Sequence, residues 1–133
     1  MTCSLYYISL RFAWISVALL IFTSFKYITR RSWKYSINCF FRKYHIPAGI
    51  LMIITSFLHG IFAGNEITTT FENLQIASDF FTLNLGTACF SVILLLWLTY
   101  LLRRNLKKRW IVFHRGLTIL LILLTILHIY NNL

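Results

Sequence analysis

Four apolar stretches, each about twenty residues long, constrain the fold of this 133-residue chain more than any other feature. A helix of that length crosses the hydrocarbon core of a bilayer. The stretches cover approximately residues 5–25, 45–64, 82–102 and 110–130. Composition agrees, because 59% of the residues are hydrophobic and only 12% are charged, too few polar groups to cover a soluble domain. The sequence therefore predicts an all-α integral membrane protein, a four-helix bundle forming one transmembrane domain over residues 1–133.

Basic and acidic residues occupy different connections between the apolar stretches. Lys and Arg fill the connections between the first and second stretches and between the third and fourth, whereas all three acidic residues lie between the second and third. Basic loops stay in the cytoplasm by the positive-inside rule. We therefore expect both termini outside, in a multi-pass protein of the plasma membrane. The net charge of +10 then reports topology and gives no reason to expect a nucleic-acid partner.

Two of the connections carry weak helical patterns. Apolar residues recur at helical spacing over residues 32–44, which predicts either an interfacial amphipathic helix or an amphipathic lead-in to the second span. Pro47 suits the first turn if that span starts near His45, but lies inside the helix if the start is earlier. In the outer connection, Thr69 followed by Glu72 is the pattern of a capping box and predicts a short helix.

All four histidines lie in the second and fourth stretches. His45 and His59 are 14 residues apart, and His114 and His128 have the same separation. Fourteen helical residues rise ~21 Å and end within ~40° of the starting face. Because these two spans are expected to run in the same direction, His45 should lie level with His114, and His59 with His128. The sequence thus predicts two stacked sites with two imidazoles each.

Two imidazoles on facing helices suit the axial ligation of a haem in a bundle core. We expect an inner b-type haem on His45 and His114 and an outer one on His59 and His128, with no open iron position for catalysis. Zinc and di-iron sites use carboxylates or closely spaced ligands, and no Asp or Glu lies in any stretch. The sequence contains no CxxCH motif, so covalent attachment of haem is not expected. The alternative is a cofactor-free structural or assembly protein whose histidines form helix–helix hydrogen bonds.

Haem propionates are anionic and need basic partners. Arg115, together with Arg42 and Lys43, is the candidate at the inner site. Arg11 is the only charged residue in the first stretch and is the candidate at the outer site, unless it extends to lipid headgroups instead. We expect the five glycines of this chain to allow either close packing of helices or room for the porphyrin. They are Gly49, Gly60, Gly64, Gly86 and Gly116.

The two His-x13-His pairs resemble the transmembrane core of the ferric reductase and NADPH oxidase superfamily. The strings YHIPAG at 44–49 and FHRG at 113–116 resemble the starts of ligand helices in small bacterial b-type cytochromes. The resemblance covers roughly residues 40–130. It implies two b-type haems that pass electrons from a cytoplasmic-side donor, a flavoprotein or reductase subunit, to an acceptor on the outer face.

The larger members of that superfamily have six helices and a cytosolic flavin and nicotinamide domain. This sequence has no Gly-rich dinucleotide-binding fingerprint, so a separate donor is expected. The chain would then be an electron-transfer component of an oxidoreductase. A quinone-interacting cytochrome b subunit of a larger oxidoreductase is the alternative within the same class.

Overall fold

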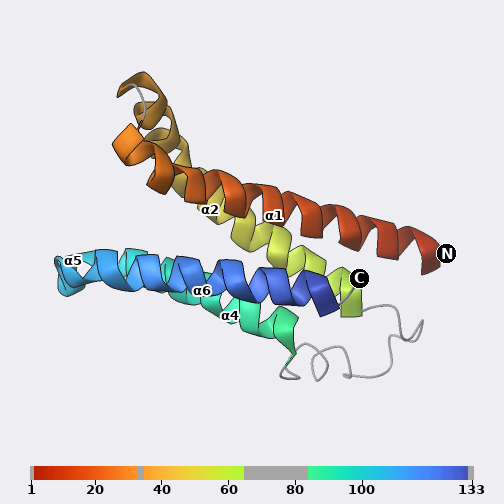
Figure 1. The fold of residues 1–133 in the computed structure, drawn as a ribbon. Coiled ribbons are helices and arrows are strands. Elements are labelled where there is room, and N and C mark those ends of the chain that lie inside the picture. Colours follow the sequence, from red (N-terminus) through yellow and green to blue (C-terminus); the bar gives the residue numbers. More distant parts are fainter. Residues whose placement is uncertain (1, 33–34, 65–83, 132–133) are drawn as a thin grey trace. The chain divides into compact units, whose positions relative to one another are not determined.

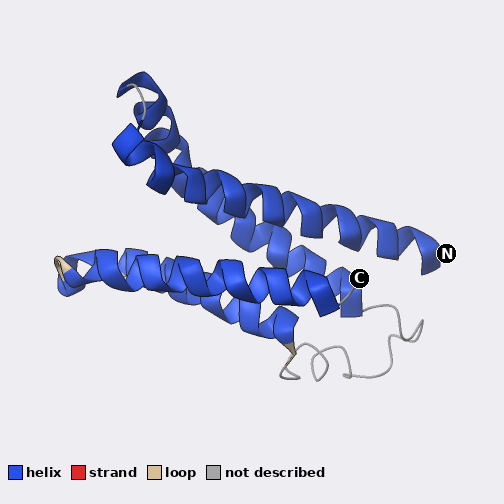
Figure 2. Cartoon of the chain, viewed as in Figure 1, coloured by secondary structure: helices blue, strands red, loops and turns tan. Residues whose placement is uncertain are grey.

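The computed structural model describes residues 2–32, 35–64 and 84–131, and within these ranges the chain is helical apart from short turns (Figures 1 and 2). The helices are α1 (Thr2–Ser32), α2 (Tyr35–Gly64), α4 (Leu85–Leu101), α5 (Arg103–Leu106) and α6 (Arg109–Asn131). The all-α prediction is confirmed. The short helix predicted at Thr69, and all three acidic residues, lie outside the described residues.

Three helices are long and apolar enough to cross a membrane: Tyr7–Lys26 within α1, Ser36–Ala63 within α2, and the whole of α6. Such helices indicate a membrane protein. The fourth predicted span corresponds to α4, an apolar helix of 17 residues, slightly shorter than the ~20 that a spanning helix needs. The fourth crossing, the sidedness and the plasma membrane stay predictions.

Helix α2 begins at Tyr35, so residues 35–44 are its lead-in and Pro47 lies inside the helix. An interior proline removes one backbone hydrogen bond. Aromatic packing against α1 accompanies the extension, since the Phe41 ring lies 5.0 Å from that of Phe22 and 6.0 Å from that of Phe25, between centroids. Of the two predicted starts for this helix, the earlier one is confirmed.

The chain divides into two compact units, residues 1–73 and 74–133. In the first unit α1 and α2 form an antiparallel hairpin, and in the second α4 and α6 do the same, joined through the single turn of α5 (Figure 1). The assembly of both hairpins into one four-helix bundle stays a prediction.

Small and polar residues line the contact between α1 and α2. Ser9 and Thr55 are only 3% and 4% exposed, and Ala48 and Met52 are also buried. Ser16 Oγ donates a hydrogen bond to Thr55 Oγ1 at 2.8 Å, while the Thr55 hydroxyl donates to carbonyls of its own helix. Small side chains and hydroxyl hydrogen bonds are what membrane helices use to associate, since lipid removes the hydrophobic driving force between them.

Apolar side chains line the contact between α4 and α6. Val92, Ile93 and Leu96 of α4 are buried, and Leu121 of α6 is the most buried side chain in the described chain, at 1% exposure. Leu121 lies midway between His114 and His128, seven residues from each. Leu121 is therefore buried on the same stripe of α6 that carries the two histidines.

Replacing Thr55 with valine tests the hydroxyl contact between α1 and α2. The substitution keeps the side-chain shape but removes the acceptor of the Ser16 hydrogen bond, so the hairpin should lose about 0.6 kcal/mol, and at most about 1.7, of its association free energy. Denaturant titration in detergent micelles measures the loss. Thr118→Val is the control, because the Thr118 hydroxyl donates to the His114 carbonyl of its own helix. Equal effects of both substitutions would contradict the assigned contact.

Candidate functional site

The four histidines occupy matching positions in the two hairpins. On α2, His45 and His59 lie seven residues on either side of buried Met52, and on α6 the other two flank Leu121 in the same way. Positions seven apart lie on nearly the same face of a helix. All four histidines are half-buried. Each hairpin thus presents two partly covered imidazoles along one stripe of a single helix.

Ser9 of α1 holds the His59 ring through its Nδ1 nitrogen. His59 Nδ1 lies 3.1 Å from the Ser9 carbonyl oxygen and 2.9 Å from Ser9 Oγ. A carbonyl oxygen only accepts hydrogen bonds, so the tautomer with the proton on Nδ1 is the one that donates to the Ser9 carbonyl. The Ser9 hydroxyl in return donates to the His59 carbonyl at 3.3 Å. In a neutral ring this assignment puts the lone pair on Nε2, the nitrogen that would bind a metal.

Thr99 of α4 holds the His114 ring in a similar way. Thr99 Oγ1 donates its single proton to the Leu96 carbonyl at 2.8 Å and lies 3.1 Å from His114 Nδ1. In the tautomer with the proton on Nδ1, His114 donates this hydrogen bond and Oγ1 accepts it. The Trp110 ring, one helical turn earlier, lies 5.7 Å from the imidazole between centroids. His114 is therefore fixed by α4 at Nδ1 and contacted by an aromatic ring of its own helix.

His128 packs against the N-terminal end of α4. Asn84 caps this end, accepting from the Thr87 backbone N–H at 2.8 Å. The cap places Gly86 beside the histidine, since a Cβ on Gly86 would lie 3.4 Å from His128 Cε1 and 3.2 Å from Asn84 Oδ1. The missing side chain thus lets the helix backbone approach the imidazole. Of the two roles expected for glycines, Gly86 serves close packing against a histidine.

Two other glycines lie beside histidines in sequence and have open space around them. A Cβ on Gly49, one turn after His45, or on Gly116, two residues after His114, would meet no atom of the described chain within 4 Å. Packing between the helices of a hairpin therefore does not account for these glycines. The sequence expectation that some glycines make room for a macrocycle stays a prediction at these positions.

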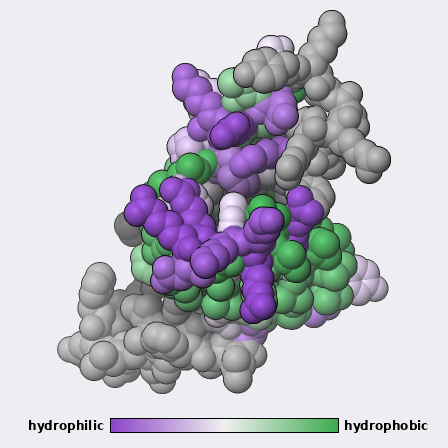
Figure 3. Space-filling model, turned by 90° about the vertical axis from the view of Figure 1, so that its left-hand side faces the viewer, coloured by the Kyte–Doolittle hydropathy of each residue, from purple (hydrophilic) through white to green (hydrophobic). Residues whose placement is uncertain are grey.

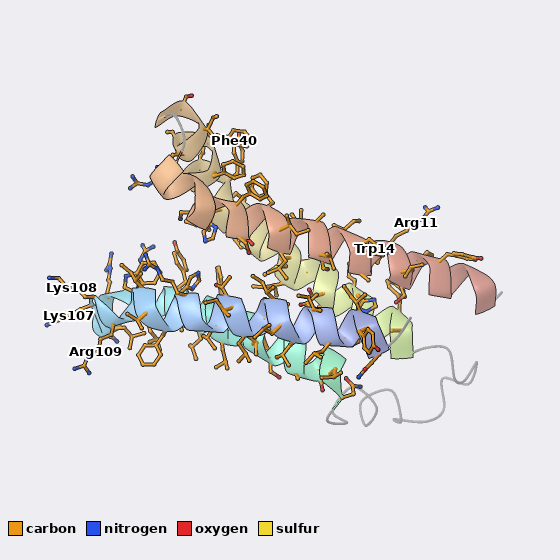
Figure 4. All side chains as sticks on the ribbon, in the orientation of Figure 1. Arg11, Trp14, Phe40, Lys107, Lys108 and Arg109 are labelled. Carbon is orange, nitrogen blue, oxygen red and sulfur yellow. The ribbon has the colours of Figure 1, made fainter. Side chains whose placement is uncertain are left out.

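The basic candidates lie at exposed positions. Arg115 is exposed beside His114, as are Arg42 and Lys43 before His45. Arg11 is also exposed, and Figure 4 shows it projecting from α1 together with Trp14. Arg11 lies two residues from Ser9, hence on nearly the opposite side of α1 from the His59 contact. This position suits the headgroup alternative, and the propionate role of each arginine stays a prediction.

Further basic residues gather at the turn between α4 and α6. Lys107, Lys108 and Arg109 project from it in Figure 4, and Figure 3 shows hydrophilic side chains gathered on the side of the molecule where α5 lies. Arg103 lies over the Tyr100 ring, 4.5 Å from its centroid. Lys107 has a φ of 49°, which turns the chain between α5 and α6. The turn thus concentrates positive charge at one end of the second hairpin.

Sequence reasoning missed Ser9 and Thr99, which contact histidine rings in the part of the chain that the structure describes. Both are hydroxyl residues in the predicted spans, a class that often bonds across membrane helices. That signal does not single them out, because Ser16, Thr23, Ser24 and Ser91 lie in the same two spans. Ser9 and Thr99 meet the histidine rings because of the register of each hairpin, which is the shift of one helix along the other.

Comparison of the chain with protein-family models, with curated proteins and with solved structures finds no match. Within the described ranges, no group of three or more His, Cys, Asp or Glu side chains lies together as a metal site. An axial haem site uses two histidines. The functional interpretation therefore depends on the geometry of the histidines themselves.

Proposed function

We propose that this chain transfers electrons across a membrane through two b-type haems, each bound by one histidine of α2 and one of α6. His45 and His114 would bind the inner haem, and His59 and His128 the outer. The donor would be a cytoplasmic-side flavoprotein or reductase subunit and the acceptor would lie on the outer face, as in ferric reductases.

The observation that carries this proposal is that Nδ1 of His59 and Nδ1 of His114 each lie within hydrogen-bond distance of a group on the neighbouring helix. Metal-bound histidines almost always donate their second ring N–H to a carbonyl, carboxylate or water, which fixes the ring orientation and strengthens the ligand. In the tautomer that donates from Nδ1, the lone pair of a neutral ring is on Nε2, as axial ligation requires. The residues present therefore fit a bis-histidine haem.

The chain's own residues would bind, orient and shield the group. Ser9 and Thr99 would orient two of the proposed ligands, and Gly86 lets α4 approach a third, His128. Arg115 on the inner side and Arg11 on the outer side would neutralise propionates. When bound, haem supplies one-electron redox chemistry with both axial positions occupied by protein. The surrounding apolar helices would keep water from both sites.

One observation favours a second candidate, a cofactor-free structural or assembly protein. The hydrogen bonds of His59 to Ser9 and of His114 to Thr99 join neighbouring helices, and polar side chains serve as such links in membrane proteins without any cofactor. Hydrogen bonding alone would not require matched fourteen-residue spacing in two hairpins, which a pair of stacked sites does require. The spacing therefore favours the haem proposal.

The haem content of the full chain, purified from haem-replete cells, decides between these functions. We expect two haems per chain, low-spin spectra in both oxidation states, and extraction of the haem by acidic acetone because attachment is non-covalent. The pyridine haemochrome assay gives the stoichiometry and the haem type. A folded, helical but colourless protein would overturn the proposal in favour of the cofactor-free function.

A further inference from the structure

We propose that the turn between α4 and α6 binds the headgroups of anionic phospholipids in the membrane. Five of the seven residues at positions 103–109 are basic, and we call these five the basic turn: Arg103, Arg104, Lys107, Lys108 and Arg109. The basic turn belongs to the second hairpin alone. Its proposed role goes beyond electron transfer and does not depend on whether the chain binds haem.

The basic turn is a dense positive charge that its own hairpin does not neutralise. All five side chains are exposed. The sequence has no Asp or Glu from residue 80 to residue 133, so the helices of this hairpin supply no carboxylate as a partner. Like charges gathered in one place repel each other, and an anion placed among them removes that repulsion. The basic turn therefore suits an anionic ligand.

Exposed apolar side chains adjoin the basic turn on both helices. Leu101 and Leu102 precede it at the end of α4, and Val112 and Phe113 follow it on α6, where Val112 is 70% exposed. A phospholipid has the same division, because its charged headgroup is joined to apolar chains. One lipid molecule can therefore contact both parts of this surface, whereas the acidic surface of a soluble protein would match only the charged part.

Aromatic residues also place the basic turn at the level of lipid headgroups. Tyr100 lies near the end of α4 and Trp110 is the second residue of α6, a helix long and apolar enough to cross a membrane. Tyr and Trp concentrate where a membrane meets water. The Arg103 guanidinium lies 4.5 Å from the centroid of the Tyr100 ring, a cation–π contact that holds it beside this aromatic residue. Basic clusters next to a membrane-spanning helix attract anionic lipids.

Lys107 occupies a backbone conformation that favours glycine. Its φ of 49° and ψ of −127° match the first central position of a type II′ turn, where Gly is the usual residue. A lysine at this position is strained, whereas a glycine would not be. The chain thus carries a positive charge where the backbone alone would favour glycine. A need for charge at this position agrees with binding of an anionic headgroup.

The test is native mass spectrometry of the full chain released from micelles that contain equal amounts of phosphatidylglycerol and phosphatidylcholine. We expect tighter binding of phosphatidylglycerol, because each basic residue near an anionic lipid surface contributes about fivefold to binding. Lys107→Gly should lower this preference by about fivefold, although the glycine suits the turn and should keep or raise resistance to unfolding. Lys107→Arg keeps the charge and should keep the preference.

Asn105→Ala is the matched control, since Asn105 is exposed between the basic residues and carries no charge. It should leave the preference for phosphatidylglycerol unchanged. Equal binding of both lipids by the unaltered chain would overturn the proposal without any variant, as would equal losses in Lys107→Gly and Asn105→Ala. Tighter binding of a soluble oligoglutamate peptide than of phosphatidylglycerol would overturn it in favour of a protein partner. Micelles have no inner and outer face, so the result does not depend on how the chain inserts.

Discussion

Replacing His59 or His128 with alanine is expected to remove the same haem, the outer one, and to leave the inner haem in place. Each substitution deletes one of two proposed axial ligands, so that site should no longer hold a low-spin bis-histidine haem. Replacing His45 or His114 should remove the other haem. The measurement is haem stoichiometry with electron paramagnetic resonance of the remaining ferric haem.

This set of four variants also tests the pairing across the hairpins. If His59→Ala and His45→Ala removed the same haem while the α6 variants removed the other, each haem would belong to one hairpin and the proposed pairing would be wrong. Phe57→Ala is the matched control, since Phe57 lies on α2 two residues from His59 with an exposed side chain. It should retain both haems with unchanged spectra.

Replacing Leu121 with alanine should destabilise the second hairpin more than any other single truncation of a described apolar side chain. Leucine-to-alanine changes in soluble cores cost ~2–5 kcal/mol, part transfer from water and part cavity. Helices that stay in lipid do not transfer the side chain from water, so only the cavity term applies. We therefore expect the free energy of unfolding to fall by about 1–3 kcal/mol. Unfolding of the full chain in mixed micelles, followed by circular dichroism, measures it.

Leu123→Ala provides the control for this truncation. Leu123 lies two residues away on the same helix and is 55% exposed, so its loss leaves no enclosed cavity. Its effect should be within about 0.5 kcal/mol of zero. Equal destabilisation by both substitutions would show that Leu121 is not packed between α4 and α6 as described.

The helices could largely be predicted from the sequence because apolar length is a strong signal in a membrane protein. The start of α2 could not be predicted, because residues 35–44 mix aromatic and basic side chains. A separate interfacial helix and a continuous α2 would both bury the apolar stripe of this segment. Packing of Phe41 against Phe22 and Phe25 belongs to the observed continuation. That contact joins residues distant in sequence, and periodicity within one segment does not reveal it.

The histidine spacing was visible in the sequence, but the residues that hold the rings were not. Hydrogen-bond partners across a hairpin depend on how far one helix is shifted along the other. A shift of one helical turn, ~5.4 Å, would place a different residue of α1 opposite His59. The register is set jointly by several packed side chains, Met52 among them. No pattern within a single helix encodes it.

The division of the chain into two hairpins has a consequence for assembly. His45 and His59 lie in one hairpin and His114 and His128 in the other. Under the proposed pairing, each hairpin would supply one ligand to each haem. Any ligand that binds only the joined form stabilises it by mass action. Under the proposed function, a supply of haem would therefore favour the joined form of the two hairpins.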